Sequence, residues 1–172
     1  MRALITGACG FVGTHLVREL VAAGREVIAV DLLDGAPASR TRRAGKDAGR
    51  EARCPAFPEG VAYRNCDLLN GDALKALVAD TRPDCVYHLA AQSSAARGIE
   101  DPHGTLETNV LGTLNLFEAV KRIDPPCPPA RSASGRIRVL SVGSAEEYGR
   151  RRSDEMPLRE ESPVEPASAY AV

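Results

Sequence analysis

The sequence lacks an excess of charge of either sign. Its 172 residues include 22 Lys and Arg against 23 Asp and Glu, which gives a formal net charge of −1 at pH 7. Binding to nucleic acid or to an acidic membrane requires a basic surface, which this balance does not supply. We interpret the local basic cluster at residues 40–46 as a solvated loop. We therefore expect no nucleic-acid partner and no membrane partner.

Long apolar runs are also missing at the N-terminus. The chain passes from Met1 and Arg2 into a short apolar run that ends at Thr6. This run is too brief for the hydrophobic part of a signal peptide or for a membrane span. The expected location is cytoplasmic.

Paired cysteine spacing is absent as well. The sequence has an odd number of cysteines, and no two of them have C-x-x-C spacing. They are Cys9, Cys54, Cys66, Cys85 and Cys127. Neither a zinc site nor a disulfide framework is indicated, so we expect reduced, structural thiols and no metal. His88 ends a predicted buried strand, where we expect it to satisfy backbone groups, and His103 lies in a Pro-containing loop.

Short apolar runs alternate with longer amphipathic stretches, which is typical of an α/β protein. The pattern predicts a doubly wound parallel sheet of about five strands, an incomplete Rossmann fold. We expect strands at residues 2–6, 26–30, 61–64, 85–89 and 136–142, and helices at 11–23, 71–80 and 105–122. Gly24 stands where the first helix should end. The third helix has one apolar face, formed by Leu106, Val110, Leu114, Phe117 and Val120.

Two stretches interrupt this alternation. Residues 34–60 are rich in Ala, Arg, Gly and Pro, and residues 124–135 are rich in Pro. Both are interpreted as loop insertions, the first exposed and mobile. From Gly149 to the end, the sequence predicts no strand or helix. We expect residues 1–172 to form the N-terminal part of one nucleotide-binding domain.

The sequence TGACGFVG, residues 6–13, places three glycines between the first strand and the first helix. Gly7 permits a sharp turn, Gly10 lets the backbone approach a pyrophosphate, and Gly13 lets the helix pack closely on the sheet. The free N–H groups at the start of the helix then bind the anion. This context predicts a dinucleotide site.

A carboxylate follows the second strand at Asp31. There it would accept hydrogen bonds from the adenosine ribose and repel a 2′-phosphate, which favours NAD over NADP. The arginines that follow could still accommodate a phosphate, so NADP stays possible. Asp67, after the third strand, is placed either to meet the adenine or to begin the helix at Gly71.

Five segments together resemble the extended short-chain dehydrogenases/reductases, also called NAD-dependent epimerase/dehydratases. These segments are residues 6–13, 66–68, 88–91, 109–115 and 144–149, and the resemblance runs nearly end to end outside the two insertions. It implies cofactor binding by Gly7, Cys9, Gly10, Phe11, Val12, Gly13, Asp31, Asp67, Leu68, Leu89, Ala90 and Ala91. A nucleotide sugar is the implied substrate.

The resemblance also implies catalytic residues. Ser144 matches the residue that hydrogen-bonds the sugar hydroxyl or ketone, and Tyr170 matches the proton-exchanging tyrosine of a Tyr-x-x-x-Lys motif. A phenol titrates near 10, so a nearby lysine and the nicotinamide must stabilise its phenolate. That lysine would fall two residues beyond Val172. We therefore expect the 172-residue chain to bind dinucleotide poorly, to expose a strand edge at residues 139–142 and to catalyse little.

The part of such proteins that follows this point would supply the remaining strands, a helix of a dimerising bundle and the substrate domain. The resemblance thus implies a homodimer for the full-length form. A non-catalytic, truncated dinucleotide-binding module is the alternative from another functional class.

Within the family, the loop at residues 143–149 looks most like GDP-6-deoxy-mannose reductases, which reduce GDP-4-keto-6-deoxymannose at carbon 4. Their neighbours, the GDP-mannose 4,6-dehydratases, are the second alternative, and hexose epimerases are the third. Glu146 occupies the place of the base that dehydratases use at sugar carbon 5. Ala145 stands where dTDP-glucose dehydratases carry an Asp, which disfavours their chemistry.

Overall fold

The computed structural model describes residues 1–32, 40–41, 52–53, 56–123 and 136–172. Among these residues, five strands form one parallel sheet in the order β5 (Ala62–Asn65), β2 (Glu26–Asp31), β1 (Arg2–Thr6), β6 (Cys85–His88) and β7 (Arg138–Ser141). The predicted α/β class and five-stranded parallel sheet are confirmed. The strand order reverses between β1 and β6, and ligands of such sheets bind at the carboxyl ends beside this reversal.

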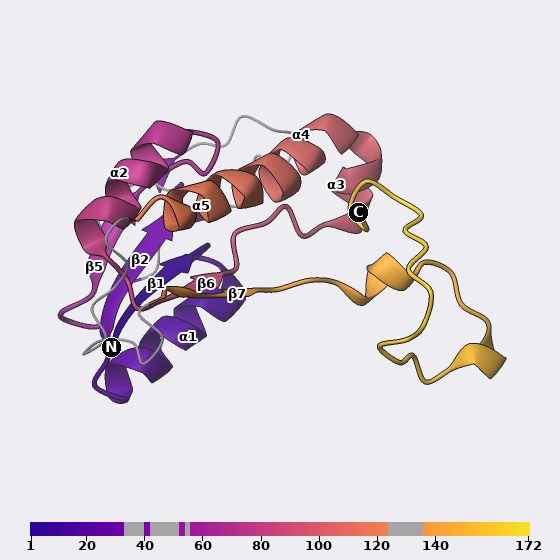
Figure 1. Ribbon diagram of the computed structural model, residues 1–172, viewed down its shortest axis with the longest axis horizontal. Coiled ribbons are helices and arrows are strands. Elements are labelled where there is room, and N and C mark those ends of the chain that lie inside the picture. The colour runs from indigo at the N-terminus through magenta and orange to yellow at the C-terminus, as the bar shows by residue number, and fades with distance from the viewer. Residues whose placement is uncertain (33–39, 42–51, 54–55, 124–135) are drawn as a thin grey trace.

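Helices cover both faces of the sheet (Figure 1). One face carries α1 (Phe11–Ala22), and the other carries α2 (Gly71–Thr81) and α5 (Gly112–Lys121). Because successive strand residues point to opposite faces, Leu4 of β1 packs toward α2 and α5, whereas Ile5 packs with Val17 of α1. Strands buried on both sides read as continuous apolar runs, which is why their positions could be predicted.

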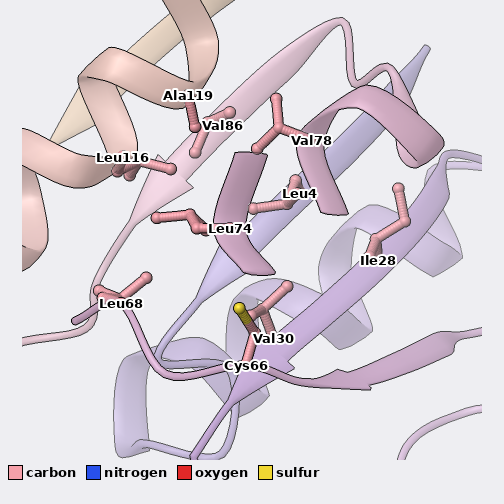
Figure 2. Close-up of a cluster of buried hydrophobic side chains, with 10 residues drawn as sticks. All are labelled: Leu4, Ile28, Val30, Cys66, Leu68, Leu74, Val78, Val86, Leu116 and Ala119. Atoms are coloured by element: carbon pink, nitrogen blue, oxygen red, sulfur yellow. The ribbon is translucent and has the colours of Figure 1, made fainter. Parts of the chain in front are cut away.

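The larger cluster of buried side chains joins the sheet to α2 and α5 (Figure 2). Leu4, Val30 and Val86 belong to three adjacent strands, and Leu74 and Leu116 lie on the two helices. All five of these side chains are no more than 1% exposed. This packing fixes the strand ends against the helices that surround them.

The predicted helix at 105–122 is longer and less regular than expected. It begins as α4 (Pro102–Leu106), widens into a π-helical turn, η1 (Glu107–Leu111), and continues as α5. Asp101 starts it by accepting a hydrogen bond from the Gly104 N–H at 2.9 Å, and Pro102 takes the first helical position. A short helix, α3 (Ala95–Glu100), precedes it and was not predicted.

The apolar face that the sequence indicates on this helix is largely exposed. Leu106, Val110, Leu114 and Phe117 are between 37% and 51% exposed. The helix packs on the sheet through another side, which includes the buried Gly112, Leu116 and Ala119. The helix therefore has two apolar sides, of which one is uncovered in this structure.

Most of the two predicted insertions lies outside the described residues. The structure leaves out residues 34–39, 42–51 and 54–55 of the first insertion and all of the second, 124–135. Within the first, β3 (Arg40–Thr41) and β4 (Ala52–Arg53) pair as a short antiparallel ladder, which the composition did not predict. Phe57, near the end of that stretch, packs on the core, its ring stacked 6.0 Å from that of Tyr63. The stretch is therefore not wholly exposed, because one aromatic side chain ties its end to the sheet.

The last part of the described chain contains no long element. Two 3₁₀ turns, η2 (Ala145–Tyr148) and η3 (Ser153–Glu155), interrupt the extended path after β7. The sequence predicted no strand or helix after Gly149, and the described residues there contain only the three-residue turn η3. β7 lies at the edge of the described sheet, and Leu140 and Val142 are 51% and 61% exposed. No helix in the described ranges has the length and apolarity needed to cross a membrane.

Candidate functional site

A cavity of about 830 Å³ opens at the carboxyl ends of β1, β2 and β6. Every residue that we expect to bind the cofactor lines it, and so do Ser144 and Tyr170. Glu146 is exposed and is not among the lining residues, whereas its neighbour Glu147 is. The fold thus brings the predicted cofactor-binding residues together with Ser144 and Tyr170 around one space, but leaves Glu146 outside its lining.

The glycine turn connects β1 to α1 at one end of this cavity. Gly7 has a φ of 69°, which favours glycine, and a Cβ built on it would lie 2.7 Å from the Ala90 nitrogen. A Cβ on Gly13 would lie 2.7 Å from the Ala8 Cα. Gly7 therefore permits both the turn and its approach to the loop after β6, while Gly13 permits the helix to pack on the turn itself.

The start of α1 has no cap within the described chain. Gly10 occupies the N-cap position, without a side-chain hydrogen bond, and the first turn contains no acidic residue. In contrast, Asn70 caps α2 by accepting from the Ala73 N–H at 3.1 Å, and Ser94 caps α3. The first N–H groups of α1 thus have no side-chain cap in the described residues, and they line the cavity at the positive end of the helix dipole, where an anion would bind.

Asp31, the last residue of β2, holds the glycine turn in place. One carboxylate oxygen accepts a hydrogen bond from the Cys9 N–H at 2.9 Å, and the other accepts from the Leu32 N–H at 2.8 Å. The sequence did not indicate this role. Two carboxylate oxygens offer about four acceptor positions, so the group retains capacity for ribose hydroxyls.

Asp67 is exposed at the rim of the cavity and accepts a hydrogen bond from the Leu69 N–H at 2.9 Å. The cap of α2 is Asn70. Of the two alternatives left open for Asp67, the structure therefore disfavours the one in which it begins this helix.

His88 lies at the inner wall of the cavity, 5% exposed. Its Nδ1 is 2.7 Å from the Thr6 hydroxyl and its Nε2 is 2.8 Å from the Thr113 hydroxyl. The expectation that it satisfies backbone groups is wrong, because both of its partners are side-chain hydroxyls. Thr6 can reach the ring because Thr6 and His88 are register partners on adjacent strands, so their side chains lie on one face of the sheet. Burial lowers the pKa of the imidazole. No cluster in the described residues could hold a metal ion.

Asn109 lies in the π-helical turn and fixes the loop after β6. Its Oδ1 accepts from the Gln92 N–H at 2.7 Å, and its Nδ2 donates to the Gln92 carbonyl at 3.1 Å. Single π turns often occur at functional sites. In the sequence, Asn109 stands out only as part of a family motif, and its two-sided contact depends on a turn that local patterns do not reveal.

Ser144 and Tyr170 approach the cavity from the last part of the chain. The Ser144 hydroxyl accepts from the Glu146 N–H at 3.2 Å and begins the turn η2. Tyr170 is partly buried and rests against Gly98 of α3, where an added Cβ would lie 2.9 Å from the Tyr170 Cβ.

Comparison with known proteins places this geometry in a family. A family model described as GDP-mannose 4,6-dehydratase matches residues 4–172. The chain belongs to this family. Its relatives are NAD-dependent epimerases and dehydratases of sugar nucleotides.

Three relatives indicate the range of this similarity. The chain is 34% identical to a UDP-glucose 4-epimerase of Mycolicibacterium smegmatis and 32% identical to a dTDP-glucose 4,6-dehydratase of Xanthomonas campestris, over 99% and 98% of its length. It is 30% identical to the Thermus thermophilus UDP-glucose 4-epimerase, solved in complex with NAD, with a TM-score of 0.73 over 99% of the chain. The chain spans 47%, 44% and 46% of these three proteins.

Proposed function

We propose that this chain is the NAD-binding part of a sugar-nucleotide oxidoreductase. The observation that carries the proposal is the uncapped start of α1, which faces the cavity beside Asp31. The N–H groups of residues 11–13 would bind the cofactor diphosphate, and Asp31 would accept the ribose hydroxyls and disfavour a 2′-phosphate. Similarity to an epimerase solved with NAD supports the choice of cofactor.

The reaction that we propose is reduction of GDP-4-keto-6-deoxymannose at carbon 4. Bound NADH would supply the hydride for this carbon. The Ser144 hydroxyl would donate a hydrogen bond to the ketone oxygen and polarise it, and the Tyr170 phenol would donate its proton to that oxygen. In the reducing direction the ketone oxygen gains a proton, and the phenol O–H is the group that would supply it.

GDP-mannose 4,6-dehydration is the second candidate, because the matching family model has that description. A dehydratase needs a carboxylate base at sugar carbon 5, and Glu146 would have to supply it. Its exposed position outside the cavity lining favours the reductase, which needs no such base.

Hexose epimerisation is the third candidate, because several relatives are UDP-glucose 4-epimerases. A non-catalytic dinucleotide-binding module is the alternative from another functional class.

The test uses the complete gene product with NADH and GDP-mannose and, separately, with NADH and GDP-4-keto-6-deoxymannose. A reductase consumes NADH only in the second mixture. A dehydratase converts GDP-mannose to the keto sugar without net consumption of cofactor. Binding of NADH without turnover of either sugar, or of a UDP-hexose, would support the non-catalytic module.

We also propose that the full-length protein is a homodimer. The stripe of Leu106, Val110, Leu114 and Phe117 is apolar, continuous along one helix and exposed in this structure. Sedimentation of the full-length protein should give a dimer, and Leu114→Glu should shift it toward the monomer. Exposed Glu107→Gln on the same helix is the control.

A further inference from the structure

Residues 149–165 run out from the sheet as a separate lobe, and the chain then returns toward α3 (Figure 1). Glu147 before this lobe and Tyr170 after it both line the cavity. The large apolar side chains of the lobe do not form a core of their own in the described structure, since Met156 and Val164 are 56% and 62% exposed. The Arg151 side chain, in contrast, is only 9% exposed. The centre of this lobe is therefore a charged group.

The Arg151 guanidinium contacts both the outgoing and the returning segments of the lobe. Its Nη1 is 3.5 Å from the Glu155 Oε1 and 3.4 Å from the Glu165 Oε2, and its Nη2 donates to the Pro163 carbonyl. Its Nε is buried and has no hydrogen-bond partner among the described residues. The planar guanidinium of Arg holds several acceptors in one fixed geometry, which the compact ammonium of Lys does not reproduce.

The two segments also cross directly beside Arg151. Gly149 has a φ of 70°, and a Cβ built on it would lie 3.1 Å from the Glu165 carbonyl carbon. The Glu165 N–H donates to the Glu147 carbonyl at 3.0 Å. Glu147 lines the cavity, so this crossing connects the base of the lobe to the proposed site.

We propose that Arg151 is a positioning residue that closes the lobe and thereby fixes Ser144 relative to Tyr170. The inference rests on the proposed function, because those two residues flank the lobe and would act on the same oxygen. Without the guanidinium, the crossing at Glu165 would depend on its backbone hydrogen bond to hold a long, coreless loop closed. The returning chain would then place the phenol less accurately.

The first test is cleavage of the 172-residue chain by a Glu-specific protease, which can cut after Glu155, Glu160 and Glu161. Arg151→Met should be cut about tenfold faster than the parent chain, and Arg151→Lys at an intermediate rate. Arg152→Met is the matched control, because that side chain is 81% exposed and pairs with Asp154 at the surface. It should be cut at the parental rate. Equal cleavage of the Arg151→Met and Arg152→Met chains overturns the proposal.

The second test measures steady-state kinetics of the complete gene product. Arg151→Met should lower kcat for the keto sugar about tenfold or more and leave the KM for NADH unchanged, because Arg151 does not line the cavity. An unchanged kcat overturns the positioning role. If the parent protein neither binds NADH nor turns over a sugar nucleotide, the proposed function fails, and with it the positioning role that rests on it. The protease result would then concern only closure of the lobe.

Discussion

The imidazole of His88 and the hydroxyl of Thr6 join two neighbouring strands, with 2.7 Å between Nδ1 and Oγ1. On the other side of the ring, the Thr113 hydroxyl donates its own hydrogen to the Asn109 carbonyl at 2.6 Å, so it accepts from the His88 Nε2–H. Nδ1 then accepts from the Thr6 O–H. This arrangement suits the neutral ring, and it connects β1, β6 and the long helix beside the cavity.

Acid should therefore weaken the fold through His88. Its folded pKa is lowered by burial, so the unfolded chain takes up the proton first as the pH falls through about 6.5. The stabilisation is complete above that pH and is lost as the pH falls toward the folded pKa. Urea unfolding at pH 7.5 and at pH 5.5 measures the effect.

His88→Asn removes the titrating ring from the same position. It should cost about 1–3 kcal/mol at pH 7.5 and should reduce the loss of stability on acidification. His103→Asn, at an exposed position, should behave as the parent chain at both pH values. Identical acid sensitivity of the parent and His88→Asn chains would contradict this account.

A methyl group on Gly13 should disturb the turn. Gly13→Ala places a Cβ against Ala8, so we expect a loss of about 1–3 kcal/mol in unfolding free energy. Gly71→Ala is the matched control, because the nearest atom to its Cβ is the Asn115 Oδ1 at 3.4 Å and alanine is the better helix former. Equal stability of the two variants would show that Gly13 is not in tight contact.

Cysteine alkylation should report occupancy of the cavity. Cys9 is partly exposed in the glycine turn, whereas burial raises the pKa of the Cys66 thiol and lowers its thiolate fraction at neutral pH. Iodoacetamide should therefore modify Cys9 faster than Cys66, and NAD should slow the reaction of Cys9. Peptide mapping by mass spectrometry separates the two sites. Modification of Cys9 at the same rate with and without saturating NAD would place the dinucleotide elsewhere.

Gly98 should be needed for the position of Tyr170. Glycine is costly within a helix, and the structure uses its missing side chain to admit the Tyr170 Cβ, which an added Cβ would meet at 2.9 Å. In the complete gene product, Gly98→Ala should lower kcat about tenfold with little change in NADH affinity. Ile99→Ala, 76% exposed on the same short helix, is the control. Parental kcat in Gly98→Ala would mean that the tyrosine is not held there.

The strands and the glycine turn could be predicted because their signals are local. Residues 2–6 and 85–88 are apolar runs that are buried on both faces, and Gly24, with a φ of 68°, follows the first helix as its sequence position indicates. In contrast, α3 has six residues, too few to show helical periodicity. The π turn at residues 107–111 lies inside a continuous helix, and no local sequence pattern marks it.

The other features that the sequence did not predict are contacts between residues that lie far apart in the chain. Periodicity found the apolar stripe that contains Leu114, but it cannot tell whether a sheet, a partner or solvent covers that stripe. Arg151 looks like one of several solvated arginines in the sequence, and only the returning chain at Glu165 buries it. Likewise, Asp31 holds the turn through Cys9, across a separation that no local pattern spans.

The central claim is that a dinucleotide diphosphate binds at the start of α1. The most direct measurement is a titration of the ¹⁵N-labelled 172-residue chain with NAD, followed by NMR at concentrations that reach the millimolar range so that weak binding is detected. We predict saturable shifts of the backbone amide signals of residues 9–13 and of Asp31, with smaller effects from NADP. A folded chain whose amide signals in this turn do not move with either cofactor would contradict the account.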